Sequence, residues 1–214
     1  MCRLLYVNSK NEFPISTYLE KFAAVAKNSR EFQGHGWGCA FSNDGEWEFY
    51  KNVMPIWEDV FSRFGNSSRL IVHARSAFKD EGIVVENNMP FYDDKLIFVF
   101  NGELRGVKIK EEGRIGAEKI FNYIKRFDKG NVKEALQKGT EIITKKSAYV
   151  RAMNIILSDE NASYIHSQFS EDDEYFTMFK RITDDTVVVC SDPFPGENGW
   201  TPIENNSLTE LKCF

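Results

Sequence analysis

The chain has 214 residues, 42% of them hydrophobic and 14% aromatic, which is enough to build a sizeable core. Its formal charge of −5 argues against nucleic acid or an anionic membrane surface as a partner. No apolar run approaches the roughly 18 residues that span a bilayer, and the first apolar patch is too short for a signal peptide. We therefore expect a cytoplasmic protein without a membrane partner.

The first half of the chain alternates short strands with single helices. Leu19, Phe22 and Ala26 mark one face of an early helix, and Thr17 has the spacing of a capping box with Glu20. Strands are expected at residues 3–7, 34–41, 46–50, 70–74 and 96–100, with a hairpin turn at Asn43-Asp44-Gly45. A helix is expected over residues 56–64, and loops over 65–68 and 82–90.

The second half begins with two helices and ends with strands. Helical spacing covers residues 117–126 and 132–145. Strands are expected at 150–157, 162–167, 175–181, 186–190 and 208–212, with hairpin turns at 159–161 and 183–185. Because the helices are grouped, an α+β fold with antiparallel sheet fits better than a doubly wound parallel fold. Neither a repeat nor a linker interrupts the pattern, so a single domain over residues 1–214 is predicted.

Cys2, directly after Met1, is the most informative residue. If Met1 is removed, this cysteine carries a thiol together with a free α-amine. The amine titrates near ~8 and a cysteine near ~8.5, so one residue can supply both nucleophile and base.

The other cysteines and the histidines suggest no metal. Cys39 and Cys190 are expected to be small buried residues in strands. No CxxC pair occurs, and His35, His73 and His166 give no metal-ligand spacing. We predict neither a metal nor a cofactor.

Three further segments have residues suited to chemistry. In Gly34-His35-Gly36-Trp37-Gly38, alternate glycines indicate close approach of a ligand or another backbone. In His73-Ala74-Arg75-Ser76, an arginine ends a buried strand and needs an anionic partner, either a protein or a substrate carboxylate. Phe100-Asn101-Gly102 is either a hairpin turn or a pair of donors for an oxyanion.

Together these features resemble the class II glutamine amidotransferases, which are N-terminal nucleophile hydrolases. The resemblance runs from Met1-Cys2 through Gly36-Trp37-Gly38, His73-x-Arg75, Asn87-x-x-Pro90-Phe91 and Asn101-Gly102 to Cys190-Ser191-Asp192-Pro193. It is closest to small stand-alone members. It implies a four-layer αββα sandwich of two antiparallel sheets flanked by helices.

The resemblance also implies roles at the matching positions. Cys2 would be the nucleophile after loss of Met1, with its own α-amine as base through a water. Asn101 and Gly102 would stabilise the oxyanion. The substrate would be glutamine or another γ-glutamyl compound, and Arg75 would bind the α-carboxylate of that substrate. Trp37, Gly38 and Ser76 would also contact the substrate.

The sequence departs from the family pattern at four positions. Phe100 stands where a histidine usually precedes Asn-Gly, and Phe78 stands where a threonine is usual. Met89 replaces the histidine of the family's usual His-Pro-Phe. Gly116 stands where an aspartate normally binds the substrate α-amine. Glu103 or Glu118 could substitute for that acid, or the substrate could be a modified γ-glutamyl compound.

Several alternatives remain open at this stage. The chain could be a catalytically weak or inactive relative that binds a γ-glutamyl ligand or a protein partner. It could also act on a different amide, or use His35 or His73 as a base for a cysteine. For an active enzyme, the ammonia would pass to water or to a separate partner subunit, and the aromatic content allows a homodimer.

Overall fold

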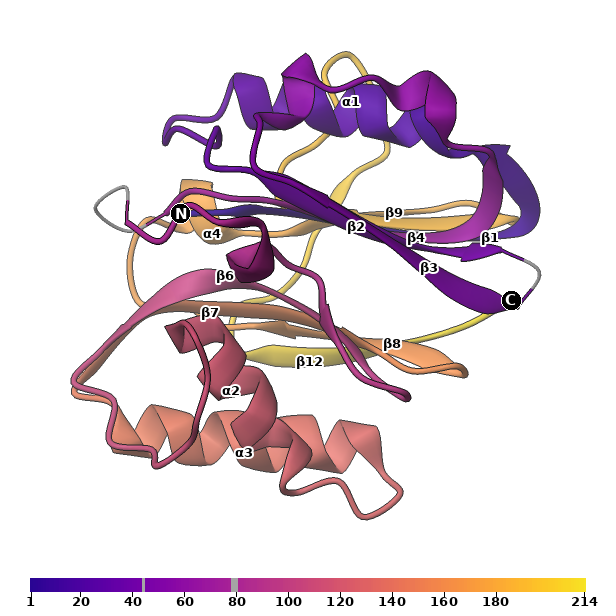
Figure 1. Ribbon diagram of the computed structural model, residues 1–214. Helices are drawn as coiled ribbons and strands as arrows, with labels where there is room; N and C mark the ends of the chain where they lie inside the picture. The colour runs from indigo at the N-terminus through magenta and orange to yellow at the C-terminus, as the bar shows by residue number, and fades with distance from the viewer. Residues whose placement is uncertain (44, 78–80) are drawn as a thin grey trace.

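The computed structural model describes residues 1–43, 45–77 and 81–214, and it contains two antiparallel sheets that pack face to face (Figure 1). The larger sheet has the strand order β11-β9-β10-β1-β4-β2-β3, and the smaller has β12-β8-β7-β6-β5. The strands of the larger sheet are β1 (Arg3–Pro14), β2 (Trp37–Asn43), β3 (Glu46–Asn52), β4 (Asn66–Ala74), β9 (Phe179–Ile182), β10 (Thr186–Cys190) and β11 (Thr201–Pro202). Those of the smaller sheet are β5 (Phe91–Tyr92), β6 (Ile97–Arg105), β7 (Tyr149–Ser158), β8 (Ala162–Ser167) and β12 (Ser207–Lys212).

Helices cover the outer faces of both sheets. Helix α1 (Ile15–Lys27) lies on the larger sheet, while α2 (Gly116–Lys125) and α3 (Val132–Lys146) lie on the smaller one (Figure 1). A short helix, α4 (Asp173–Phe176), precedes β9. The layers therefore run helix, sheet, sheet, helix, which confirms the predicted α+β sandwich of two antiparallel sheets.

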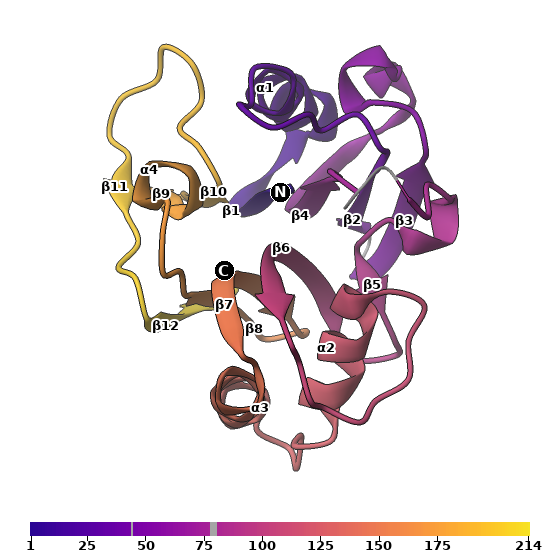
Figure 2. The same cartoon turned by 90° about the vertical axis from the view of Figure 1, so that its left-hand side faces the viewer.

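Strand β1 lies inside the larger sheet, between β4 and β10, so the N-terminus starts in the middle of the fold (Figure 2). Leu4 and Tyr6 enter the core between the sheets, whereas Leu5 and Val7 enter the core under α1. A strand buried on both faces needs apolar residues at successive positions, and the run from Leu4 to Val7 meets that need.

The predicted element boundaries fail in several places. Strand β1 continues to Pro14, seven residues beyond the predicted end, and β2 begins at Trp37, three residues after the predicted start. Residues 56–64 form two 3₁₀ turns, Ile56–Glu58 and Phe61–Arg63, in place of a helix. Residues 65–68 are not a loop, because β4 already begins at Asn66, where it pairs with Pro14. Residues 175–181 are split between α4 and β9. The capping box is wrong, since α1 begins at Ile15 after Pro14 and has no side-chain cap.

Two of the sequence expectations concern residues outside the described ranges. Asp44, in the predicted hairpin turn, and Phe78, at a departure from the family pattern, both lie there. Within the described ranges, no helix combines the length and apolar character needed to cross a membrane.

His73 on β4 is a fully buried histidine facing the core between the sheets. Burial lowers the pKa of His73 to about 3, and the positive charges of Arg75 and Lys51 act in the same direction. The ring is therefore neutral in the folded protein at neutral pH.

This burial predicts acid sensitivity. An unfolded histidine binds its proton near pH ~6.5, whereas folded His73 does so only near pH 3. Between these values the unfolded state holds the extra proton, so stability falls as pH falls, by up to about 1.4 kcal/mol per pH unit. His73→Leu should flatten this dependence between pH 6.5 and 4.5 in urea unfolding. An unchanged slope in the variant would contradict a neutral buried His73.

Candidate active site

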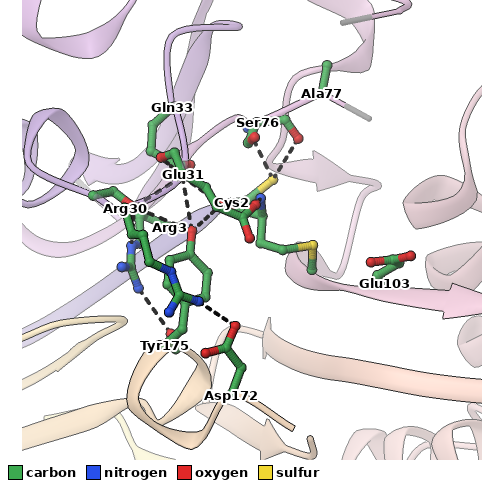
Figure 3. Close-up of polar contacts among 12 residues, drawn as sticks. Cys2, Arg3, Arg30, Glu31, Gln33, Ser76, Ala77, Glu103, Asp172 and Tyr175 are labelled. Carbon is green, nitrogen blue, oxygen red and sulfur yellow. Dashed lines mark hydrogen bonds and ion pairs between the residues drawn. The ribbon is translucent and has the colours of Figure 1, made fainter. Parts of the chain in front are cut away.

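The Cys2 thiol lies against the backbone of Ser76, just beyond the end of β4. The Ser76 N–H donates to Sγ over 3.5 Å, and Sγ lies 3.8 Å from the Ser76 carbonyl oxygen (Figure 3). Burial raises the pKa of the Cys2 thiol, while the terminal ammonium, the Ser76 N–H and Arg75 oppose that rise. The Ser76 N–H and the nearby positive charges favour the thiolate, which is the nucleophilic form.

Arg75 is a buried cation beside this thiol. Its Nη1 donates to the Gly82 carbonyl over 2.8 Å and to Asn88 Oδ1 over 3.4 Å. Burial lowers the pKa of Arg75, and the proximity of Cys2 partly offsets this. No carboxylate among the described residues forms an ion pair with its guanidinium. A buried guanidinium bonded only to neutral oxygens retains the capacity to bind an anion.

Asn101 and Gly102 lie on β6 in the opposite sheet. Phe98 stacks on Phe121 of α2, so by strand alternation Asn101 faces the larger sheet. Asn101 is 1% exposed, and its Oδ1 has no hydrogen-bond partner among the described residues. A buried acceptor without a partner is costly, and a ligand N–H could satisfy it. The donor that an oxyanion would require is Nδ2 of the same amide.

Position 102 has room for glycine but not for a larger residue. A side chain there would collide with the carbonyl oxygen of Ala152 on the neighbouring strand β7. Asn101 and Gly102 are therefore part of a β-ladder and do not form the tight hairpin turn that the Asn-Gly pair also allowed.

The Gly38 and Trp37 positions differ from each other. Gly38 pairs with His73 of β4, and a Cβ there would collide with the Met89 carbonyl oxygen, so close backbone approach explains the glycine. Trp37 faces the core under α1, where its Nε1 donates to Asp59 over 3.0 Å. Strand alternation therefore points the Trp37 side chain away from the face that carries His73, and the expectation that Trp37-Gly38 lies beside the nucleophile can apply to Trp37 only through its backbone.

Among the described residues, no hydrogen bond joins a histidine to Cys2. Neither ring nitrogen of His73 has a hydrogen-bond partner among the described residues. Nδ1 of His35 accepts the Ala77 N–H over 2.8 Å. In the same ranges, no group of three or more His, Cys, Asp and Glu side chains is arranged to hold a metal ion.

The turn after β10 holds the start of β1 in place. Oγ of Ser191 accepts the Leu4 N–H over 2.8 Å, and the Ser191 N–H donates to the Leu4 carbonyl over 3.0 Å. Arg3 adds a hydrogen bond to the Ser191 carbonyl over 3.3 Å and stacks on Tyr175, 4.1 Å from the ring centroid. Cys190 and Cys39 are fully buried, as predicted.

Sequence reasoning missed the residues around Met1. Glu31 forms an ion pair with the Met1 ammonium, and Gln33 and Tyr175 both donate to the Met1 carbonyl (Figure 3). None of the three belongs to a recognisable motif, and Tyr175 comes from the far end of the chain, so the sequence alone held no signal for them.

Gly116 begins α2, with open space where a side chain would extend. The two acids considered as substitutes are both engaged in ion pairs. Glu103 pairs with Arg105 at 2.7 Å and lies 3.5 Å from Arg151, and Glu118 pairs with Arg114. Glu118 also lines a cavity of about 550 Å³ between β3, β5 and α2, whose lining does not include Cys2 or Arg75.

Comparison with known proteins gives matches in structure alone. No protein-family model matches the chain, and no curated protein matches it in sequence. Glutamine phosphoribosylpyrophosphate amidotransferase from B. subtilis aligns with a TM-score of 0.69 and 16% identity over 99% of this chain and 49% of its own. This chain therefore spans about half of that enzyme.

Two other solved structures match over nearly their full length. A predicted glutamine amidotransferase from Pseudomonas aeruginosa has a TM-score of 0.65 at 15% identity, covering 99% of this chain and 97% of its own. A glutamine aminotransferase class-II domain protein from Silicibacter pomeroyi has 0.66 at 15% identity, covering 99% of both chains. The chain therefore has the fold of the class II glutamine amidotransferase-domain proteins, as the sequence resemblance predicted.

Proposed function

We propose that the chain is an amidohydrolase that cleaves the γ-amide of glutamine or of another γ-glutamyl compound through Cys2. The observation that carries the proposal is the pairing of a thiol with a buried arginine that has no carboxylate partner among the described residues. A γ-glutamyl compound carries both groups that this pair requires, an electrophilic carbonyl and a carboxylate. The fold shared with glutamine amidotransferase domains is consistent with this chemistry.

The reaction would begin after Met1 is removed. The Cys2 α-amine takes the thiol proton through a water, and the thiolate attacks the γ-carbonyl to form a C–S bond. The Asn101 amide and the Gly102 N–H stabilise the resulting oxyanion, each donor contributing about 10²–10³ in rate. Collapse breaks the C–N bond, the α-ammonium protonates the leaving amine, and water then hydrolyses the γ-glutamyl thioester.

The residues that would bind the substrate α-amine depart most from the family pattern. The space at Gly116 lacks an acid, and Glu103 and Glu118 are already paired with arginines. We infer that Arg75 supplies most of the recognition, and that a γ-glutamyl compound with a blocked or extended α-amine is accepted as well as glutamine. The ammonia or amine leaves to water or to a partner subunit.

Arg75 should control substrate binding. Arg75→Gln removes the cation that holds the substrate carboxylate, and kcat/KM should fall about 10²-fold, mainly through KM. Arg126→Gln, on an exposed arginine, is the matched control and should leave both constants unchanged. The measurement is steady-state ammonia release from glutamine. A KM that stays the same in Arg75→Gln would exclude this role.

Cys2 should be indispensable. Cys2→Ala, with Met1 removed, should lower glutamine hydrolysis by about 10⁴-fold or more, because no other group can form the thioester. Cys213→Ser replaces another free cysteine that is half-buried near the C-terminus, and its activity should match the parent. Hydrolysis by the Cys2→Ala chain at the parent rate would refute covalent catalysis by this residue.

A further inference from the structure

Met1 is held at three points, and each recognises a different chemical group. Its ammonium pairs with Glu31, and its carbonyl oxygen accepts from Gln33 Nε2 over 2.6 Å and from Tyr175 Oη over 2.8 Å (Figure 3). Its side chain packs against the apolar cluster of Ala152, Phe169, Tyr175 and Phe176. Ammonium, carbonyl oxygen and apolar side chain are the three parts of an apolar α-amino acid.

The Met1 ammonium belongs to a network of ion pairs. Arg151 lies 3.7 Å from Glu31, 3.5 Å from Glu103 and 3.2 Å from Asp172. The described network has four carboxylates and three guanidiniums, namely Glu31, Glu103, Glu171 and Asp172 against Arg30, Arg105 and Arg151. The Met1 ammonium is the fourth cation and pairs directly with Glu31. Removal of Met1 shifts the terminal ammonium one residue along the chain, to Cys2, so Glu31 loses its direct partner.

Gln33 is a buried polar residue that lines the space occupied by Met1. Its side chain is fully buried, and its Oε1 has no hydrogen-bond partner among the described residues. Its Nε2 faces oxygens of Met1, Glu31, Tyr175 and Ser29 within 3.3 Å, although an amide nitrogen has only two hydrogens to donate. Loss of the Met1 carbonyl would leave the Tyr175 hydroxyl only the longer contact of 3.4 Å with Ser29 Oγ, and a ligand oxygen could restore the shorter bond.

We propose that, once Met1 is removed, the space it leaves is a binding site for a free α-amino acid with an apolar side chain. The ligand ammonium pairs with Glu31, and its side chain lies on the apolar cluster. Its carboxylate receives hydrogen bonds from Gln33 and Tyr175. That carboxylate also forms an ion pair with the α-ammonium of Cys2, whose nitrogen is an uncharged amide while Met1 is attached. This proposal rests on the proposed function only in requiring loss of Met1.

The site can be tested by calorimetry with L-methionine as the probe. The protein is Cys2→Ala, whose small second residue permits loss of Met1, verified by intact mass. One equivalent of L-methionine should bind. N-acetyl-L-methionine, which lacks the ammonium, should bind at least about 10-fold more weakly. Glu31→Gln in the same background should weaken L-methionine by a similar factor.

Two controls separate the site from general effects. Glu210→Gln alters a surface acid that pairs with Lys133 and lies outside the network around Met1, and binding should be unchanged. Cys2→Asn, whose larger second residue keeps Met1 in place, should not bind L-methionine. Equal binding by the Met1-retaining chain, or indifference to Glu31→Gln and to N-acetylation, would overturn the proposal.

Absence of binding by the processed Cys2→Ala chain would also overturn it, because the new N-terminal ammonium would then occupy the Glu31 site itself. Glutamine hydrolysis by the parent chain is measured separately. Hydrolysis without methionine binding would refute only the proposed amino-acid site. Methionine binding without hydrolysis would refute only the proposed catalytic function.

Discussion

The fold depends on the central position of its first strand. Because β1 pairs with β4 and β10, residues at the very start of the chain are held by hydrogen bonds on both sides. Ser191 adds two hydrogen bonds to the backbone of Leu4, two residues from Cys2. A terminal residue normally frays, but here its strand cannot leave without opening the larger sheet. The sheet thereby turns a mobile terminus into a fixed part of the interior.

The face of the larger sheet that meets the smaller one carries an unusual set of polar groups for a core. Cys2, His73 and Arg75 lie on this face, with Asn101 opposite on β6. His73 avoids the cost of burial by staying neutral, whereas Arg75 bonds, within the described part of the chain, to one carbonyl and one amide oxygen. This leaves a cation next to the thiol and, on the opposite sheet, an amide with an unpartnered oxygen, at the cost of stability that an apolar core would supply.

Most of the fold followed from sequence because its elements have strong periods. The helical spacing of α2 and α3 predicted these helices almost to the residue, whereas the apolar run after Cys2 predicted only the first part of β1, which continues to Pro14. The failures have local causes. Residues 56–64 are aromatic-rich but pack as 3₁₀ turns against Trp37, and the apolar pair Tyr175-Phe176 supports α4 by filling a cluster around Met1. The motif residues Cys2, Arg75, Asn101 and Gly102 could be named, but Glu31, Gln33 and Tyr175 could not, because only tertiary packing brings them to the N-terminus.

The most direct test of the account is intact mass before and after incubation with an electrophilic glutamine analogue, followed by peptide mapping. The account predicts loss of Met1 and a single adduct, located on Cys2 and suppressed by excess glutamine. A chain that has lost Met1 and stays unlabelled, or is labelled on Cys213 with Cys2 intact, would contradict the assignment of Cys2 as the nucleophile of a γ-glutamyl site.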